Sequence, residues 1–196
     1  MKSEHKRRGP IKSLEKHTLT EIVIFKGKSN VDLTGLADLL IEHSSSRLSP
    51  DIIDARHEDS FCPESPIIDQ IIEDLKIAFK KATGGLEIRL DEKWSHIHEK
   101  NMSTNRHDHY PAAVSSAFYV SVPEGGGEIW FGDYHNKYPD CGREIVFKPE
   151  EGMFLLFPGH LEHFVTRNRS EEIRISLGFN FEVIQKNSHI EQEKAK

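Results

Sequence analysis

Hydrophobic and polar positions divide the chain into a helical N-terminal part and a strand-rich remainder. Residues 31–43 (VDLTGLADLLIEH) predict a short helix, with Asp32 as its candidate cap. Residues 65–82 predict a longer helix, because Ser65 can cap it and Pro66 stands in its first turn. Its apolar residues recur three or four positions apart and form one stripe: Ile68, Ile71, Ile72, Leu75 and Phe79.

Short apolar runs separated by turns rich in Gly and Pro (PEGGGE, KPEEG, FPGH) follow from residue 86. Two helices followed by a series of short strands predict an α+β domain whose β part is a sandwich or a barrel. We expect one domain over residues 1–196, with flexible tails at 1–17 and 184–196. The predicted strands are 19–26, 86–98, 113–122, 127–131, 143–148, 152–157, 163–167 and 172–181.

Composition narrows the class of protein. The chain has 196 residues, of which 36% are hydrophobic and 30% charged, as is typical of a globular domain. The net charge of −6 argues against nucleic acid as the main partner. No apolar run reaches the roughly 20 residues that a membrane span needs. Cys62 and Cys141 lie far apart with no CxxC spacing, which favours a reducing, cytoplasmic location.

Histidine is the unusual residue, with 12 copies in the chain. His107, Asp108 and His109 stand together just before a predicted strand. On an extended chain, residues two apart face the same side, so His107 and His109 converge while Asp108 points away. Two converging imidazoles can bind a metal, although a polar loop fits the same pattern.

Other histidines keep the choice of metal ligands open. His96 and His98 in WSHIH repeat the same spacing. A further ligand is expected from a distant strand, and FPGHLEHF offers His160 and His163.

The last predicted strand, EIRISLGFNF, has one apolar face and one polar face. Arg174 and Ser176 share the polar face, and a forked guanidinium beside a hydroxyl is suited to binding a carboxylate. An ordinary solvent-exposed strand face is the alternative interpretation.

The order of these motifs resembles the Fe(II)- and 2-oxoglutarate-dependent oxygenases. The resemblance is to a small bacterial and phage branch related to the prolyl hydroxylases. It covers a little under half of the chain. The matching stretches are Trp94, which stands thirteen residues before HDH, then SSAFYVSVPEGGGEIWFGD, PEEGMFLLFPGHLEHFV and RISLGFNF.

The resemblance implies a double-stranded β-helix (a jelly-roll or cupin-like barrel) supported by the N-terminal helices. It implies that His107, His109 and His163 bind Fe(II), and that Arg174 and Ser176 bind the cosubstrate 2-oxoglutarate. His109 stands where the family usually has a carboxylate, and Asp108 is the alternative ligand. Residues expected to line the pocket are Tyr119, Trp130, Asn180 and His96.

The implied activity is that of a dioxygenase that uses O₂ and 2-oxoglutarate to hydroxylate a protein side chain or a small metabolite. We expect small molecules as partners, neither a nucleic acid nor a membrane, and a homodimer as the candidate assembly. One alternative is a cupin-like dioxygenase or isomerase that does not use 2-oxoglutarate, in which His96 or His98 would join the metal. A ligand-binding barrel without catalysis is another.

Overall fold

The computed structural model describes residues 22–45, 62–132 and 144–184. The predicted tail at 1–17 lies outside these residues, as does the predicted tail at 184–196 except for Ile184. The elements are β1 (Phe25–Lys28), α1 (Leu36–Ser45), α2 (Pro66–Ala82), β2 (Glu87–His98), β3 (Thr104–His107), β4 (Val114–Ser121), β5 (Ile129–Phe131), β6 (Ile145–Phe147), β7 (Met153–Pro158), β8 (His163–Val165) and β9 (Arg174–Ile184).

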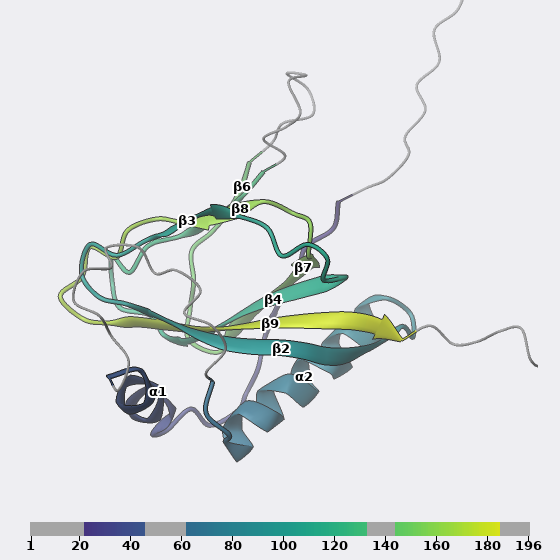
Figure 1. Cartoon of the computed structure of the whole chain (residues 1–196), viewed down its shortest axis with the longest axis horizontal. Coiled ribbons are helices and arrows are strands. Elements are labelled where there is room, and N and C mark those ends of the chain that lie inside the picture. Colours follow the sequence, from purple (N-terminus) through teal and green to yellow (C-terminus); the bar gives the residue numbers. More distant parts are fainter. Residues whose placement is uncertain (1–21, 46–61, 133–143, 185–196) are drawn as a thin grey trace, which may run out of the picture.

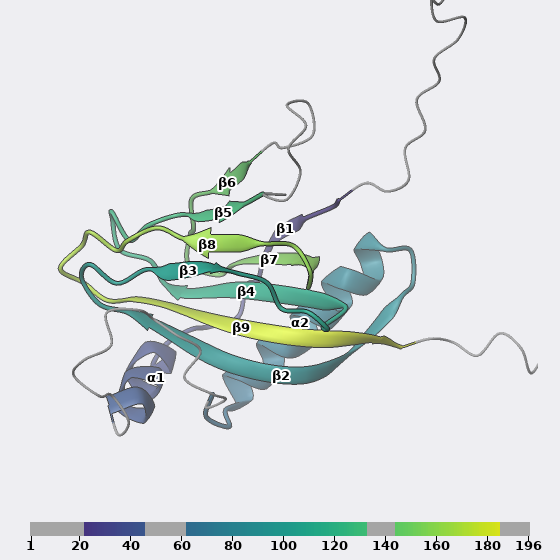
Figure 2. The same ribbon diagram turned by 45° about the horizontal axis from the view of Figure 1, so that its top comes forward.

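Two antiparallel sheets face each other (Figure 1). The larger sheet has the strand order β1-β7-β4-β9-β2, and the smaller sheet has the order β3-β8-β5-β6. Both helices lie on the side of the larger sheet that faces away from the smaller one, as Figure 2 also shows. The predicted α+β class and the double-stranded β-helix are therefore confirmed.

Helix α2 forms as its sequence predicts. Ser65 accepts a hydrogen bond from the backbone N–H of Ile67, and Pro66 is the first helical residue. The five residues of the predicted stripe are all buried, and they pack in one cluster with the apolar face of β9. No helix of the described residues is long and apolar enough to cross a membrane.

Helix α1 begins later than predicted, at Leu36 instead of near residue 31. Asp32 does not cap it. The Asp32 carboxylate instead accepts hydrogen bonds from the backbone N–H and the hydroxyl of Thr34, which fixes the turn before the helix.

The strands differ most from the prediction at the first strand and at β3. Of the predicted strand 19–26, residues 19–21 lie outside the described part of the chain. The strand that the structure describes there runs from Phe25 to Lys28, where Phe25 pairs with Leu156 on β7. Strand β3, which pairs with β8, was not predicted as a separate strand. Its sequence, TNRH, has no apolar residue, so hydrophobic periodicity gives no signal there.

The polar face of β9 points into the space between the two sheets. Trp94 on β2 is the register partner of Gly178, and a Cβ atom at position 178 would lie 2.2 Å from the indole ring. Only glycine therefore lets the Trp94 ring cross the strand at this point, beside the pocket described next.

Candidate active site

Three histidine side chains meet at one end of the space between the sheets. His107, His109 and His163 each offer a ring nitrogen, and these nitrogens all lie within 4.8 Å of one another. His109 and His163 are buried, with 9% and 4% exposure, and His107 is half-buried. Such a cluster of convergent imidazoles suits a divalent transition metal.

Two of these imidazoles are oriented by backbone carbonyl groups. His107 Nδ1 donates to the carbonyl oxygen of Asn105 at 2.7 Å, and His163 Nδ1 donates to that of Leu161 at 3.0 Å. A carbonyl can only accept, so in each neutral ring the lone pair lies on Nε2. Metal-binding histidines are typically oriented in this way, so the cluster fits a metal ion.

His107 and His163 are register partners, on β3 and β8 respectively. His109 lies two residues beyond the end of β3, so strand pairing does not place it. Its backbone N–H donates to the carbonyl oxygen of Gly159 at 2.7 Å. A Cβ atom at position 159 would lie 2.1 Å from the backbone oxygen of Ala112, so glycine permits this close approach.

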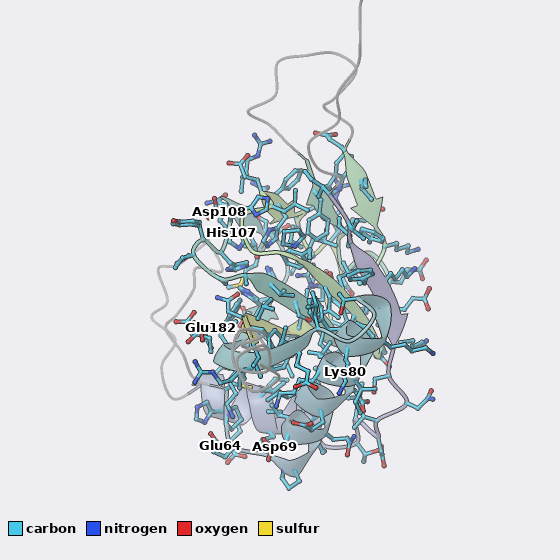
Figure 3. All side chains as sticks on the ribbon, turned by 90° about the vertical axis from the view of Figure 1, so that its right-hand side faces the viewer. Glu64, Asp69, Lys80, His107, Asp108 and Glu182 are labelled. Carbon is cyan, nitrogen blue, oxygen red and sulfur yellow. The ribbon has the colours of Figure 1, made fainter. Side chains whose placement is uncertain are left out.

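Two alternative ligands lie elsewhere. Asp108 is exposed, and its carboxylate accepts a hydrogen bond from the backbone N–H of Tyr110 at 3.0 Å. Figure 3 shows Asp108 beside His107, at the opposite end of the molecule from Asp69 on α2. His160 is exposed and is not part of the three-histidine cluster.

Aromatic rings surround the cluster. The Phe131 ring stacks on His163 with centroids 5.4 Å apart, and the Phe157 ring meets His163 edge-on at 4.9 Å. The Trp94 ring lies 5.1 Å from that of His109. These rings pack the sides of the cluster with apolar surface, which limits access of water to it.

A buried cation lies in the same pocket as the histidines. Arg174, the first residue of β9, is 1% exposed and lines the pocket together with His107, His109 and His163. No described carboxylate forms an ion pair with it, and its Nε has no hydrogen-bond partner. A buried cation without an anionic partner is costly, so this guanidinium fits an anionic ligand.

A row of polar side chains lies one register step along β9 from Arg174. His96, Ser176 and Tyr119 are register partners across β2, β9 and β4, and all three line the pocket. The Tyr119 hydroxyl is buried and has no hydrogen-bond partner. Burial raises the pKa of Tyr119 to about 12, against the opposing effect of Arg174, so the hydroxyl remains a neutral donor.

Two residues that were expected to line the pocket do not lie along it. The Trp130 ring stacks on Phe164 at 5.8 Å. The Asn180 side chain accepts a hydrogen bond from Ser115 and donates one to Glu92. Alternation correctly places Asn180 on the same face of β9 as Arg174. Asn180 lies six residues further along the strand, however, and is beyond the end of the pocket.

Sequence reasoning missed the surroundings of Arg174. Its guanidinium donates to the carbonyl oxygen of Gly126 at 3.4 Å and to Nδ1 of His98 at 3.3 Å. The sequence suggests a role for His98 only as a metal ligand in the cupin-like alternative. Its register pairing with Arg174 across β2 and β9 would have indicated the contact, but register is not visible in one sequence.

Known proteins provide an independent comparison. The family model described as "Putative 2OG-Fe(II) oxygenase" matches residues 92–180, a segment that includes the three clustered histidines and Arg174. The resemblance to the 2-oxoglutarate- and Fe(II)-dependent oxygenases is confirmed. Among curated proteins, no sequence matches the chain.

Solved structures of 2-oxoglutarate oxygenases share the fold. The chain is similar to a prolyl-4-hydroxylase from Pseudomonas putida, with a TM-score of 0.56 and 19% identity over 81% of this chain and 91% of that one. It is also similar to the non-heme alpha-ketoglutarate-dependent carbocyclase SnoK from nogalamycin biosynthesis, with a TM-score of 0.59 and 8% identity over 88% and 86% of the two chains. At these identities the likeness establishes the oxygenase fold and leaves the reaction open.

A third structure carries ligands. The epimerase SnoN, in complex with Fe³⁺, alpha-ketoglutarate and nogalamycin RO, has a TM-score of 0.55 and 13% identity over 86% of this chain and 83% of its own. A hydroxylase, a carbocyclase and an epimerase thus share the oxygenase fold of this protein.

Proposed function

We propose that the protein is an Fe(II)- and 2-oxoglutarate-dependent dioxygenase that hydroxylates a protein side chain or a small metabolite. The observation that carries the proposal is the buried guanidinium of Arg174. It lies in one pocket with three convergent histidines, and no described carboxylate pairs with it. A metal cluster and a carboxylate-binding cation in one pocket suit a ligand that chelates metal at one end and carries a carboxylate at the other.

Each residue has a role in this proposal. His107, His109 and His163 hold Fe(II) through ring nitrogens, and Arg174 binds the far carboxylate of 2-oxoglutarate. The Ser176 hydroxyl, one row away on the same face of β9, supplies a further donor. Bound iron would supply the activation of O₂, coupled to the oxidative decarboxylation of 2-oxoglutarate to succinate and CO₂.

Three neutral imidazoles replace the usual pair of histidines and one carboxylate, so the bound metal keeps one more unit of net positive charge. That charge favours a dianionic chelating ligand. The surrounding apolar rings of Phe131, Phe157 and Trp94 strengthen the attraction because they lower the local dielectric constant.

The cupin-like alternative requires His96 or His98 at the metal, and both are engaged in other contacts. His96 Nε2 accepts a hydrogen bond from Trp94 Nε1 at 2.7 Å. Both nitrogens of His98 have hydrogen-bond partners, in Thr104 and Arg174. These contacts favour the oxygenase hypothesis over the cupin-like hypothesis.

Arg174→Ala tests the proposal. A charge-assisted hydrogen bond to a carboxylate contributes about 1.5–3 kcal/mol, so the affinity of the Mn(II)-loaded protein for 2-oxoglutarate should fall about 10- to 150-fold. Arg174→Lys should recover part of this loss, because an ammonium group cannot bind a carboxylate with a fork of two donors. Calorimetric titration with 2-oxoglutarate measures both effects.

The metal affinity of Arg174→Ala is the internal control. It should equal that of the wild type, because the residue is not part of the histidine cluster. Unchanged 2-oxoglutarate affinity in Arg174→Ala would remove the basis of the proposal.

A further inference from the structure

His98, a buried histidine outside the metal cluster, contacts Arg174 directly. The two residues are register partners at the adjoining ends of β2 and β9, and their exposed fractions are 0% and 1%. Arg174 Nη2 lies 3.3 Å from His98 Nδ1, and His98 Nε2 lies 2.9 Å from the hydroxyl oxygen of Thr104 on β3. A chain of hydrogen bonds therefore runs from the smaller sheet, through His98, to the guanidinium.

The chemistry of the two side chains sets the direction of these bonds. A guanidinium has five N–H donors and no acceptor, so His98 Nδ1 must be the acceptor. The single ring proton of neutral His98 then lies on Nε2, which donates to Thr104 Oγ1. Burial, aided by the charge of Arg174, lowers the pKa of His98 to about 3, so the imidazole is neutral at physiological pH.

These contacts limit how the guanidinium can turn. One terminal nitrogen donates to His98 and the other to the carbonyl oxygen of Gly126, while Nε has no partner. Three of the five N–H donors remain for a ligand. An unrestrained arginine side chain would lose much rotational freedom on binding, so contacts that fix it beforehand favour affinity.

We propose that His98 is a positioning residue, which receives its own orientation from Thr104 and holds the Arg174 guanidinium ready for the far carboxylate of a 2-oxo dicarboxylic acid. The inference rests on the proposed function. A histidine that merely fills the core would affect folding and leave ligand selectivity unchanged. Selectivity for the far carboxylate therefore distinguishes the two roles.

The test compares two ligands on the Mn(II)-loaded full chain: 2-oxoglutarate, and 2-oxobutyrate, which has the same 2-oxo acid end and no second carboxylate. In His98→Phe, which keeps an aromatic ring and removes both nitrogens, the preference for 2-oxoglutarate should fall about 3- to 10-fold. Affinity for 2-oxobutyrate and for Mn(II) should stay the same, because the loss concerns only the far carboxylate.

Two further variants keep the test decisive if His98→Phe does not fold. His98→Asn retains an acceptor at about the position of Nδ1, and should keep most of the preference. Thr104→Val removes the hydroxyl that orients the ring, and should lower the preference about 2- to 3-fold. His160→Phe is the matched control, because His160 is exposed and outside the three-histidine cluster.

The outcomes separate the two proposals. A wild type that does not prefer 2-oxoglutarate to 2-oxobutyrate would overturn the proposed function, and with it the role of His98. A wild type that does prefer it, with the same preference in folded His98→Phe or in Thr104→Val, would overturn the role of His98 alone.

Discussion

At the scale of single residues, the pocket combines a buried cation with buried neutral rings. Arg174 is charged because the ordinary pKa of arginine lies above 12, although burial lowers it here. Burial also lowers the pKa of His98 beside it. Because the ordinary pKa of histidine is far lower than that of arginine, His98 loses its proton while Arg174 keeps its own. This difference lets one side chain donate and the other accept.

The low pKa of His98 predicts a pH dependence of stability. Its pKa is about 3 in the folded protein against 6.5 ordinarily, so the unfolded chain binds more protons between these values. The free energy of unfolding therefore decreases as pH falls from 6.5 toward 3. In metal-free protein, the stability advantage of wild type over His98→Phe should shrink by up to about 1.4 kcal/mol per pH unit.

Urea unfolding of both proteins at several pH values between 4 and 7 measures this difference. The two proteins share every other titratable group, so the contributions of those groups cancel in the difference. A constant difference across the range would mean that His98 is not held neutral by the fold.

Asp108 and His109 form the second residue-scale prediction. Asp108→Asn should leave metal affinity unchanged, because the Asp108 carboxylate is held by the Tyr110 backbone and lies outside the cluster. His109→Asp should retain metal, because it restores a set of two histidines and one carboxylate. Titration with Fe(II) or Mn(II) measures both. Loss of metal in Asp108→Asn with retention in His109→Ala would reverse the assignment.

The matched pair His160→Ala and His163→Ala completes this test. Only His163→Ala should lose the metal, since His160 is not part of the cluster. The opposite result would show that the wrong histidine has been assigned.

At the scale of elements, α2 supports the larger sheet from behind the pocket. Ile71 on this helix is 0% exposed and Ile77 is 64% exposed, so the two positions offer the same chemistry in two environments. Ile71→Ala should lower the free energy of unfolding by about 2–5 kcal/mol, because it leaves a cavity in the core. Ile77→Ala should change it by less than about 0.5 kcal/mol. Equal effects in urea unfolding would mean that α2 does not pack as described.

Sequence periodicity predicted the elements that carry enough apolar residues. The stripe on α2 and the alternation along β9 both define one face that must be buried, and the structure joins these two faces. Periodicity could not predict β3, because its four residues are polar and its position depends on pairing with β8. The start of α1 was predicted too early for another reason: aspartate is as common in turns as at helix caps, and Asp32 belongs to a turn.

The candidate site was predictable where it depends on local order and not where it depends on register. His107 and His163 follow from motif order, and Arg174 follows from alternation along one strand. The partnership of Arg174 with His98 joins β2 to β9 across 76 residues of sequence. The convergence of His109 with His107 was predicted from its spacing, although His109 lies beyond the end of β3.

At the scale of the whole molecule, the pocket exists only because two sheets face each other. His107 and His163 come from the smaller sheet, and Arg174 and Ser176 come from the larger one. Correct packing of the sheets therefore brings the candidate metal ligands to the candidate carboxylate-binding residues. The helices stabilise this arrangement from outside without contributing to the pocket lining.

The most direct test of the central proposal is an anaerobic titration of the Fe(II)-loaded protein with 2-oxoglutarate, followed by visible absorption. Chelation of the iron by the 2-oxo acid should produce a weak charge-transfer band that saturates with 2-oxoglutarate, and Arg174→Ala should need a higher concentration to reach the same band. Iron that is bound, with no band at any 2-oxoglutarate concentration, would contradict the oxygenase proposal and favour the cupin-like alternative.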